Sequence, residues 1–241
     1  MQNATITSSL SNPLSTGSVV EQIIKRLTDA LSSRELQPGQ KIPTEMELCE
    51  SLQVGRNSVR EAIKILVAMG VLEIRRSEGT FVCQGFSSRM LDPLVYGLIL
   101  EGGGTDKLIE LRRIFDNGIL QTALEKATES NIAEIHGKLK AFRETVESTS
   151  DEDAILEADI VFHSALEGVL DNPLVKKISM VINRLTYPTR ILAIRKFIKS
   201  GEKGRLIKLH ENLTSVIEKR DSSMISQAME EHYQYWQHVS N

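Results

Sequence analysis

Residues 37–82 read QPGQKIPTEMELCESLQVGRNSVREAIKILVAMGVLEIRRSEGTFV, and this stretch decides the fold of the amino-terminal third of the chain. Thr44 and Glu47 have the spacing of a capping box, which predicts the start of a short helix. After a tight turn, apolar residues recur at helical spacing from Arg56 to Gly70, where the glycine ends a second helix. The β-branched, alternating residues of VLEIR and TFV, separated by RSEG, predict a two-stranded hairpin.

Another helix is predicted just before this stretch. Ser18 and Glu21 form a capping-box pattern, and apolar residues continue at helical spacing to near Arg34. Three helices followed by a hairpin are typical of a winged helix-turn-helix. We therefore predict a DNA-binding domain over residues 18–84, preceded by a flexible tail over residues 1–17, which are rich in Ser, Thr and Asn.

The start of the third helix carries side chains suited to reading DNA. Arg binds guanine edges or phosphates, Asn binds adenine, and Ser binds phosphate oxygens. The candidate residues are Arg56, Asn57, Ser58 and Arg60. Arg75 and Arg76 lie at the predicted hairpin turn, where a wing can reach the DNA backbone or the minor groove. The alternative is that these arginines are only exposed surface charges, solvated by water and without a binding role.

The charge of this module is balanced. Residues 1–84 contain nine Lys or Arg and nine Asp or Glu, and the whole chain has a formal net charge of −3. A nucleic-acid partner must therefore be bound by a local basic patch, because the overall charge does not attract it. DNA affinity is expected to depend on where the charges lie and on two copies acting together.

The remainder of the chain is helical in pattern. Residues 85–104 predict a linker with a short helix, and residues 105–241 predict an antiparallel bundle of helices joined by short loops. The expected helix starts are Asp92, Thr105, Ser130, Asp151, Pro173, Arg205 and Asp221. Pro188 is expected to kink or break the helix that contains it. The predicted fold class is mostly α, with an amino-terminal winged helix-turn-helix and a carboxy-terminal all-α bundle.

Three histidines and one aspartate in the bundle form a candidate metal site. Asp159 and His163 are four residues apart and therefore share one helix face, while His210 and His232 lie on two later helices. Three imidazoles and a carboxylate suit zinc or a similar divalent ion, and leave positions for water or a ligand. The alternative is an Asp–His hydrogen bond at the surface. The two remaining histidines are expected to face solvent, namely His136 and His238.

Composition excludes several classes of protein. Of the 241 residues, 41% are hydrophobic and 25% are charged, which excludes disorder throughout the chain. Cys49 and Cys83 are too few for a disulfide scaffold and suit a reducing compartment. Apolar stretches such as residues 91–100 are too short to span a bilayer, and the amino terminus lacks the features of a secretion signal. We therefore expect a cytoplasmic protein with no membrane partner.

Residues 37–82 resemble the GntR family of bacterial transcription regulators, and specifically its FadR-like branch. They are similar to the family pattern of PG, a PSE-type helix start, V-S-R-x-x-V-R-E-A-L and G-T-F-V. The resemblance implies that residues of the recognition helix and of the wing contact double-stranded DNA. The residues at these positions are Arg56, Asn57, Ser58 and Arg60 on the helix, with Arg76 and Ser77 on the wing.

Two positions depart from the family pattern. Met46 stands where the family commonly has an Arg that touches DNA, so one guanine or phosphate contact of the family is in question. Gly55 replaces the usual Ser or Thr at the cap of the recognition helix. The preferred operator is therefore not assumed to be the commonest palindrome of the family.

The segment from about Leu108 to His238 resembles the FCD effector-binding domain that accompanies FadR-like winged helices. It contains LIELRRIF at its start and the D-x-x-F-H pattern at its middle. The four ligand positions of the metal-binding subgroup are filled, by Asp159, His163, His210 and His232. The resemblance implies a bound divalent cation, and zinc is the expected ion. Acyl-CoA-binding relatives lack this set, which argues against a fatty-acyl effector.

Arg112 is the candidate effector-binding residue, because it lies in the E-x-R segment of the family. A divalent cation with open positions, assisted by an Arg, suits a small carboxylate such as a hydroxy acid, a sugar acid or a dicarboxylate. The segment LDPLVYGLIL resembles the linker of sugar-acid regulators in this family. The alternative is that Arg112 or Arg113 only pairs with Glu110 or Asp116 on its own helix.

These observations predict a ligand-responsive transcription regulator. We expect a homodimer that represses transcription from a palindromic operator and is controlled by a small carboxylate at the metal site. The rival interpretation is a metal-dependent hydrolase or isomerase using the same Asp/His site. The sequence contains no H-E-x-x-H, and no carboxylate besides Asp159 is placed as a general base. A third interpretation is that the cation only stabilises the bundle.

Overall fold

The computed structural model describes residues 18–86, 88–100, 104–234 and 236. The chain divides into two compact units, Met1–Tyr96 and Gly97–Asn241. Within the described residues, none of the helices combines the length and the apolar character needed to cross a membrane.

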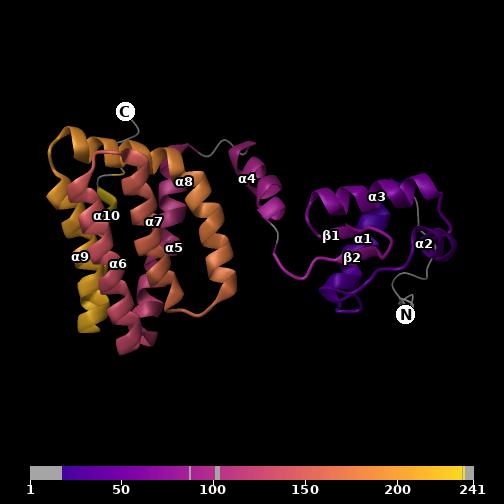
Figure 1. Cartoon of the computed structure of the whole chain (residues 1–241), viewed down its shortest axis with the longest axis horizontal. Coiled ribbons are helices and arrows are strands. Elements are labelled where there is room, and N and C mark those ends of the chain that lie inside the picture. Colours follow the sequence, from indigo (N-terminus) through magenta and orange to yellow (C-terminus); the bar gives the residue numbers. More distant parts are fainter. Residues whose placement is uncertain (1–17, 87, 101–103, 235, 237–241) are drawn as a thin grey trace. The chain divides into compact units, whose positions relative to one another are not determined.

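The first unit is a three-helix module with a hairpin (Figure 1). Its elements are α1 (Val19–Ser32), α2 (Glu45–Leu52), α3 (Arg56–Ala68), β1 (Leu72–Arg75) and β2 (Gly79–Val82). α3 packs against both α1 and α2. The two strands are antiparallel, and Leu72 lies opposite Val82, so that both side chains face the core. The winged helix-turn-helix predicted from the sequence is confirmed.

Local signals explain where these helices begin and end. The Ser18 side chain accepts a hydrogen bond from the backbone of Glu21, and Thr44 and Glu47 make both bonds of a capping box. Between α2 and α3 the chain turns sharply, with Gln53 in the left-handed region at φ 55°. Gly55 is the N-cap of α3, and no side chain caps this helix. The start of α3 is therefore set by the turn and by packing.

The second unit is a bundle of helices, shown side by side in Figure 1. Its helices are α5 (Thr105–Lys126), α6 (Glu129–Ser148), α7 (Glu152–Gly168), α8 (Pro173–Lys199), α9 (Lys203–Lys219) and α10 (Ile225–Gln234). α4 (Leu91–Leu100) spans the boundary between the two units. α6 packs on α7 and α9, α7 packs on α8, and α5 contacts α7, α8, α9 and α10. The mostly α fold class is confirmed.

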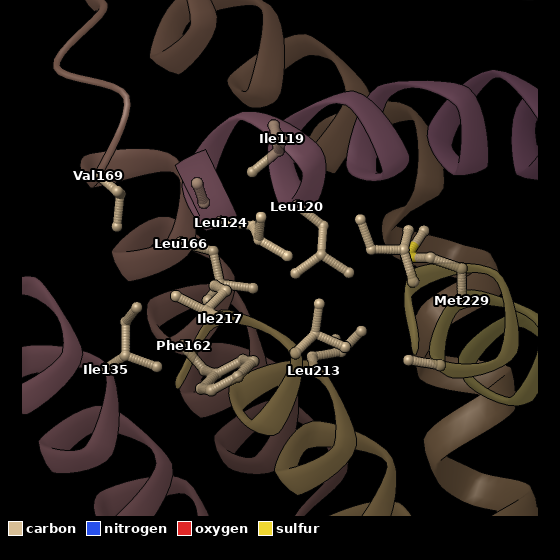
Figure 2. Close-up of a cluster of buried hydrophobic side chains, with 14 of the residues drawn as sticks. Ile119, Leu120, Leu124, Ile135, Phe162, Leu166, Val169, Leu213, Ile217 and Met229 are labelled. Carbon is tan, nitrogen blue, oxygen red and sulfur yellow. The ribbon is translucent and has the colours of Figure 1, made fainter. Parts of the chain in front are cut away.

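The main core of the bundle is apolar and draws on five helices. Figure 2 shows Leu120 of α5, Phe162 of α7 and Leu213 of α9 near the centre of the cluster, with Ile135 of α6 on one side and Met229 of α10 on the other. These side chains are buried. This core fixes α7, α9 and α10 against one another, and these are the three helices that carry the candidate histidines.

Three local expectations differ from the structure. α6 begins one residue before Ser130, because Thr128 and Asn131 form the capping box. Pro188 does not break α8, since it lies on the exposed side of the helix, where a carbonyl without an amide partner can face water. The last helix begins with a separate 3₁₀ turn, Ser222–Met224, which Asp221 caps.

Candidate metal centre and DNA-binding surface

The three histidines predicted as metal ligands meet inside the bundle. His163 comes from α7, His210 from α9 and His232 from α10, and one nitrogen of each lies within 4.8 Å of the others. All three side chains are buried, and His210 is 0% exposed. The ring centroid of His210 lies 4.2 Å from the ring centroid of Phe142 and 5.0 Å from that of Phe162. This packing fixes the position of the His210 ring.

Asp159 completes the group. One helical turn before His163 on α7, its Oδ1 lies 2.6 Å from Nε2 of His210 and 3.8 Å from Nε2 of His163. The carboxylate is buried as well. The structure therefore brings together all four residues that the sequence singled out, and it places them in the interior, where the alternative of a surface Asp–His bond does not apply.

Burial disfavours the charged form of all three imidazoles. Burial, together with the positive charge of Arg112, lowers the pKa of His163 well below its usual value, and burial and the neighbouring histidines do the same for His232. Burial lowers the pKa of His210 to about 4. Each neutral ring keeps one nitrogen lone pair, which is the form that binds a metal ion.

The donor set fits a divalent cation. Nδ1 of His210 lies 2.9 Å from the carbonyl oxygen of Leu206, and its Nε2 lies 2.6 Å from Oδ1 of Asp159. In the tautomer whose Nδ1–H donates to Leu206, Nε2 keeps its lone pair and is available to a metal ion together with the carboxylate. Nδ1 of His232 is buried without a hydrogen-bond partner. Zinc holds imidazole nitrogens at about 2.0–2.1 Å, which suits a cluster of this size.

Arg190 was missed by the sequence reasoning, although it contacts a predicted ligand. This residue of α8 is 1% exposed, and its Nη2 bonds to Oδ2 of Asp159. Its Nη1 donates to Oδ1 of Asn183 over 2.9 Å, while its Nε is buried without a partner. The available signal was an Arg seven residues, or about two helical turns, after an Asn, which puts both on one face of the helix.

Arg112 of α5 is also buried, and it shares the hydrogen-bond partner Asn183 with Arg190. Its Nε lies 3.2 Å from Asp116 on its own helix, as the alternative interpretation expected. Its Nη1 in addition donates to Asn183 over 2.8 Å and to Thr186 over 3.1 Å. Burial acts against its charge, yet the carboxylate of Asp116 raises the pKa of Arg112 overall. Two guanidinium groups thus share Asn183 beside the histidines.

Two small cavities border the histidine cluster. One of about 10 Å³ is lined by Asp116, His163, Glu167 and His232 among others, and burial and Asp116 raise the pKa of Glu167. The other, of about 20 Å³, is lined by Asp159, Arg190, His210, His232 and Trp236 among others. Each has roughly the volume of one water molecule. A multi-carbon acid therefore enters only if side chains move.

The predicted DNA-contacting residues lie at the start of α3 and at the hairpin turn. Arg56, Asn57 and Arg60 are exposed, whereas Ser58 is half-buried. Both arginines bond to one carboxylate, that of Glu45 at the start of α2. Arg76 and Ser77 are exposed at the turn between β1 and β2.

The other residues singled out in the sequence have simpler surroundings. Arg75 bonds to Glu73 and packs 4.2 Å from the ring of Phe81. Met46 is 70% exposed beside Glu45. The His136 side chain is 46% exposed and lies 3.6 Å from Glu218, while His238 lies outside the described residues.

Comparison with known proteins identifies two matching families. Residues 19–82 match the family described as "Bacterial regulatory proteins, gntR family", and residues 107–235 match the "FCD domain". The HTH-type transcriptional regulator LutR of Bacillus subtilis (strain 168) is 30% identical over 84% of this chain and 92% of its own length.

A second curated relative and a solved structure are also similar to this chain. The Galactonate operon transcriptional repressor of Escherichia coli (strain K12) is 34% identical over 61% of this chain and 65% of its own length. The solved structure of a Streptococcus agalactiae GntR has a TM-score of 0.60 and 28% identity, and covers 90% of this chain and 97% of that chain.

Proposed function

Because the chain belongs to the GntR family of bacterial regulatory proteins and carries an FCD domain, we propose that it represses transcription from a palindromic operator until a small carboxylate releases it. The observation that carries this proposal is the presence, in one chain, of an exposed Arg- and Asn-bearing helix start and a buried cluster of metal-ligand type. The family and the relatives are transcription regulators, and the hydrolase or isomerase alternative has no support from them.

We assign the DNA-binding role to residues 18–84. Arg56, Asn57 and Arg60 present exposed polar groups at one end of α3, and Ser58 lies among them. Arg76 and Ser77 are exposed on the wing. A helix end of this chemistry reads base edges in the major groove, while the wing contacts the backbone or the minor groove. Residues 85–104 are assigned as a linker, and the predicted tail over residues 1–17 lies outside the described residues.

Residues 105–241 are assigned to effector binding and dimerisation. A palindromic operator presents two identical half-sites, which a homodimer with one recognition helix per subunit matches. Exposed apolar side chains on α5 and α8 supply a surface for a second copy, and they include Leu111, Ile114, Leu174 and Ile178. Since the partner is DNA, we place the protein in the cytoplasm.

Replacing Arg56 with Ala is expected to weaken binding to a preferred duplex by about 1–3 kcal/mol, because a bidentate base or phosphate contact is lost. The preferred duplex is the one that the wild-type protein enriches from a random library. Affinity is measured by fluorescence anisotropy. Lys140→Ala, a loss of one exposed positive charge on α6, serves as the control and should bind as the wild type does. Unchanged affinity of the Arg56 variant would contradict the assignment of α3.

The metal site is assigned to Asp159, His163, His210 and His232, with zinc as the ion. Support comes from the three histidine nitrogens that lie within 4.8 Å of one another, from Oδ1 of Asp159 beside two of these histidines, and from the unpartnered Nδ1 of His232. When bound, the ion supplies positive charge and open coordination positions for a carboxylate. Arg190 holds the outer oxygen of Asp159, which leaves the inner oxygen directed at the histidines.

The effector is assigned as a small hydroxy acid, sugar acid or dicarboxylate, with Arg112 as its charged partner. The name of the relative that controls a galactonate operon supports a sugar acid. Since each cavity has room for about one water, binding must displace side chains of α8 or α10 that line it. Such a displacement couples the site to the bundle, and a coupling of about 1–3 kcal/mol changes DNA affinity about 5- to 150-fold.

A further inference from the structure

One carboxylate holds both arginines of the proposed recognition helix. Glu45 is the first residue of α2, and its Oε2 accepts hydrogen bonds from Nε of Arg56 over 3.2 Å and from Nη2 of Arg60 over 3.3 Å. The Glu45 side chain is 31% exposed, whereas those of Arg56 and Arg60 are 68% and 46% exposed. The acid thus lies beneath the arginines, which remain accessible to DNA.

These bonds leave part of each guanidinium available. The bond to Arg56 uses Nε, so the outer pair of N–H groups, one on each terminal nitrogen, is not engaged by Glu45. A guanine is recognised by two parallel N–H groups of one Arg, which the terminal nitrogens can provide. An arginine already held in place loses less conformational freedom when it binds a base edge. Glu45 therefore favours a fixed, base-reading geometry.

The same carboxylate opposes binding to phosphates. Partial burial works against its charge, but hydrogen bonds from Arg60 and Arg56 lower the pKa of Glu45 overall, so it is ionised at neutral pH. Its negative charge offsets one of the two positive charges at the start of α3. Sequence-independent affinity comes from such charges acting on the DNA backbone. Glu45 therefore weakens sequence-independent binding to the DNA backbone more than it weakens binding to a preferred sequence.

We propose that Glu45 determines specificity, by positioning Arg56 and Arg60 for base edges and by restraining their attraction to phosphates. The inference rests on the proposed role of α3 in DNA recognition. Glu45 contacts no base itself and acts through Arg56 and Arg60. The expected signature is a change in the preference between two DNA sequences.

The test compares three variants of the full chain. Glu45→Gln removes the charge but keeps the side-chain length, and Glu45→Asp keeps the charge but shortens the reach by one methylene. Glu50→Gln is the matched control, because Glu50 is an exposed acid on the same helix. Each protein is titrated into a duplex of about 20 base pairs enriched by the wild type, and into a scrambled duplex, at about 0.15 M salt.

The measured quantity is the dissociation constant for the scrambled duplex divided by that for the enriched duplex. Glu45→Gln should lower this ratio about three- to fivefold, mainly through tighter binding of the scrambled duplex. Glu45→Asp should lower the ratio through weaker binding of the enriched duplex. Glu50→Gln should keep the wild-type ratio. Thermal unfolding of all three variants should match that of the wild type.

Two results would overturn the proposal. The first is a Glu45→Gln ratio equal to that of Glu50→Gln, which would make the effect one of net charge alone. The second is a wild-type ratio in Glu45→Asp, which would show that the position of the acid is irrelevant. Failure of the recognition-helix assignment is distinguished from both, because Arg56→Ala would then bind the enriched duplex as the wild type does.

Discussion

Replacing His210 with Ala is expected to weaken zinc binding by at least about 100-fold. Loss of a residue that merely orients a ligand typically lowers metal affinity about 10- to 100-fold, so loss of a ligand has at least the larger effect. His210 faces both Asp159 and the other two imidazoles, and its Nε2 lies 2.6 Å from the Asp159 carboxylate. Zinc affinity is measured by competition with a chromophoric chelator, and stoichiometry by native mass spectrometry.

Two further variants make this result interpretable. Ala at position 210 also leaves a cavity beside Phe142 and Phe162, so His210→Gln, which is of similar volume and a poor zinc ligand, should show the same loss of affinity with a smaller loss of stability. His136→Ala removes an exposed histidine and should bind zinc as the wild type does. Full zinc occupancy in both His210 variants would exclude His210 as a ligand.

Replacing Arg190 with Ala is expected to lower the free energy of unfolding by about 3–5 kcal/mol. Removing one partner of a buried ion pair leaves the other charge without compensation. Asp159 would lose its guanidinium partner in the interior, and Asn183 would lose one of its two donors. Urea denaturation monitored by circular dichroism measures the change.

Arg195 on the same helix provides the matched control. It makes an ion pair with Glu152 at 2.7 Å, but the two side chains are 44% and 27% exposed, so water screens the pair and Arg195→Ala should change stability little. A bound divalent cation compensates the charge of Asp159, so added zinc should restore more stability to Arg190→Ala than it adds to the wild type. Equal stability of the Arg190 and Arg195 variants would show that the buried network contributes nothing measurable.

The elements of the first unit follow from local signals in the sequence. Thr44 and Glu47 predict the start of α2 because a capping box satisfies backbone amides without help from the rest of the fold.

In the second unit, the start of α6 was predicted less well. Thr128 and Ser130 are both good caps, and the choice depends on the hydrogen bond that the Asn131 side chain accepts from the backbone of Thr128. Of the two effects expected of Pro188, a break was wrong because α8 continues through it, with the proline on the solvent-facing side of the helix.

The candidate site was predictable in part. Asp159 and His163 share a helix face by their spacing alone, and His210 and His232 were added by residue type and by family resemblance. Arg190 could not be placed in this way, because an Arg in a helix usually faces water and only the packing of α7 on α8 buries it. The size of the cavities depends on side-chain packing from four helices, which no local pattern encodes.

The central claim is that a metal site in the bundle controls DNA binding by the amino-terminal module. The most direct test is the affinity of the zinc-loaded wild type for its enriched duplex, measured with and without each of a panel of hydroxy acids, sugar acids and dicarboxylates. At least one acid should weaken binding about 5- to 150-fold, and this response should vanish in His210→Ala and after treatment with EDTA. The claim is contradicted if no acid changes the affinity, or if the response persists undiminished without the metal.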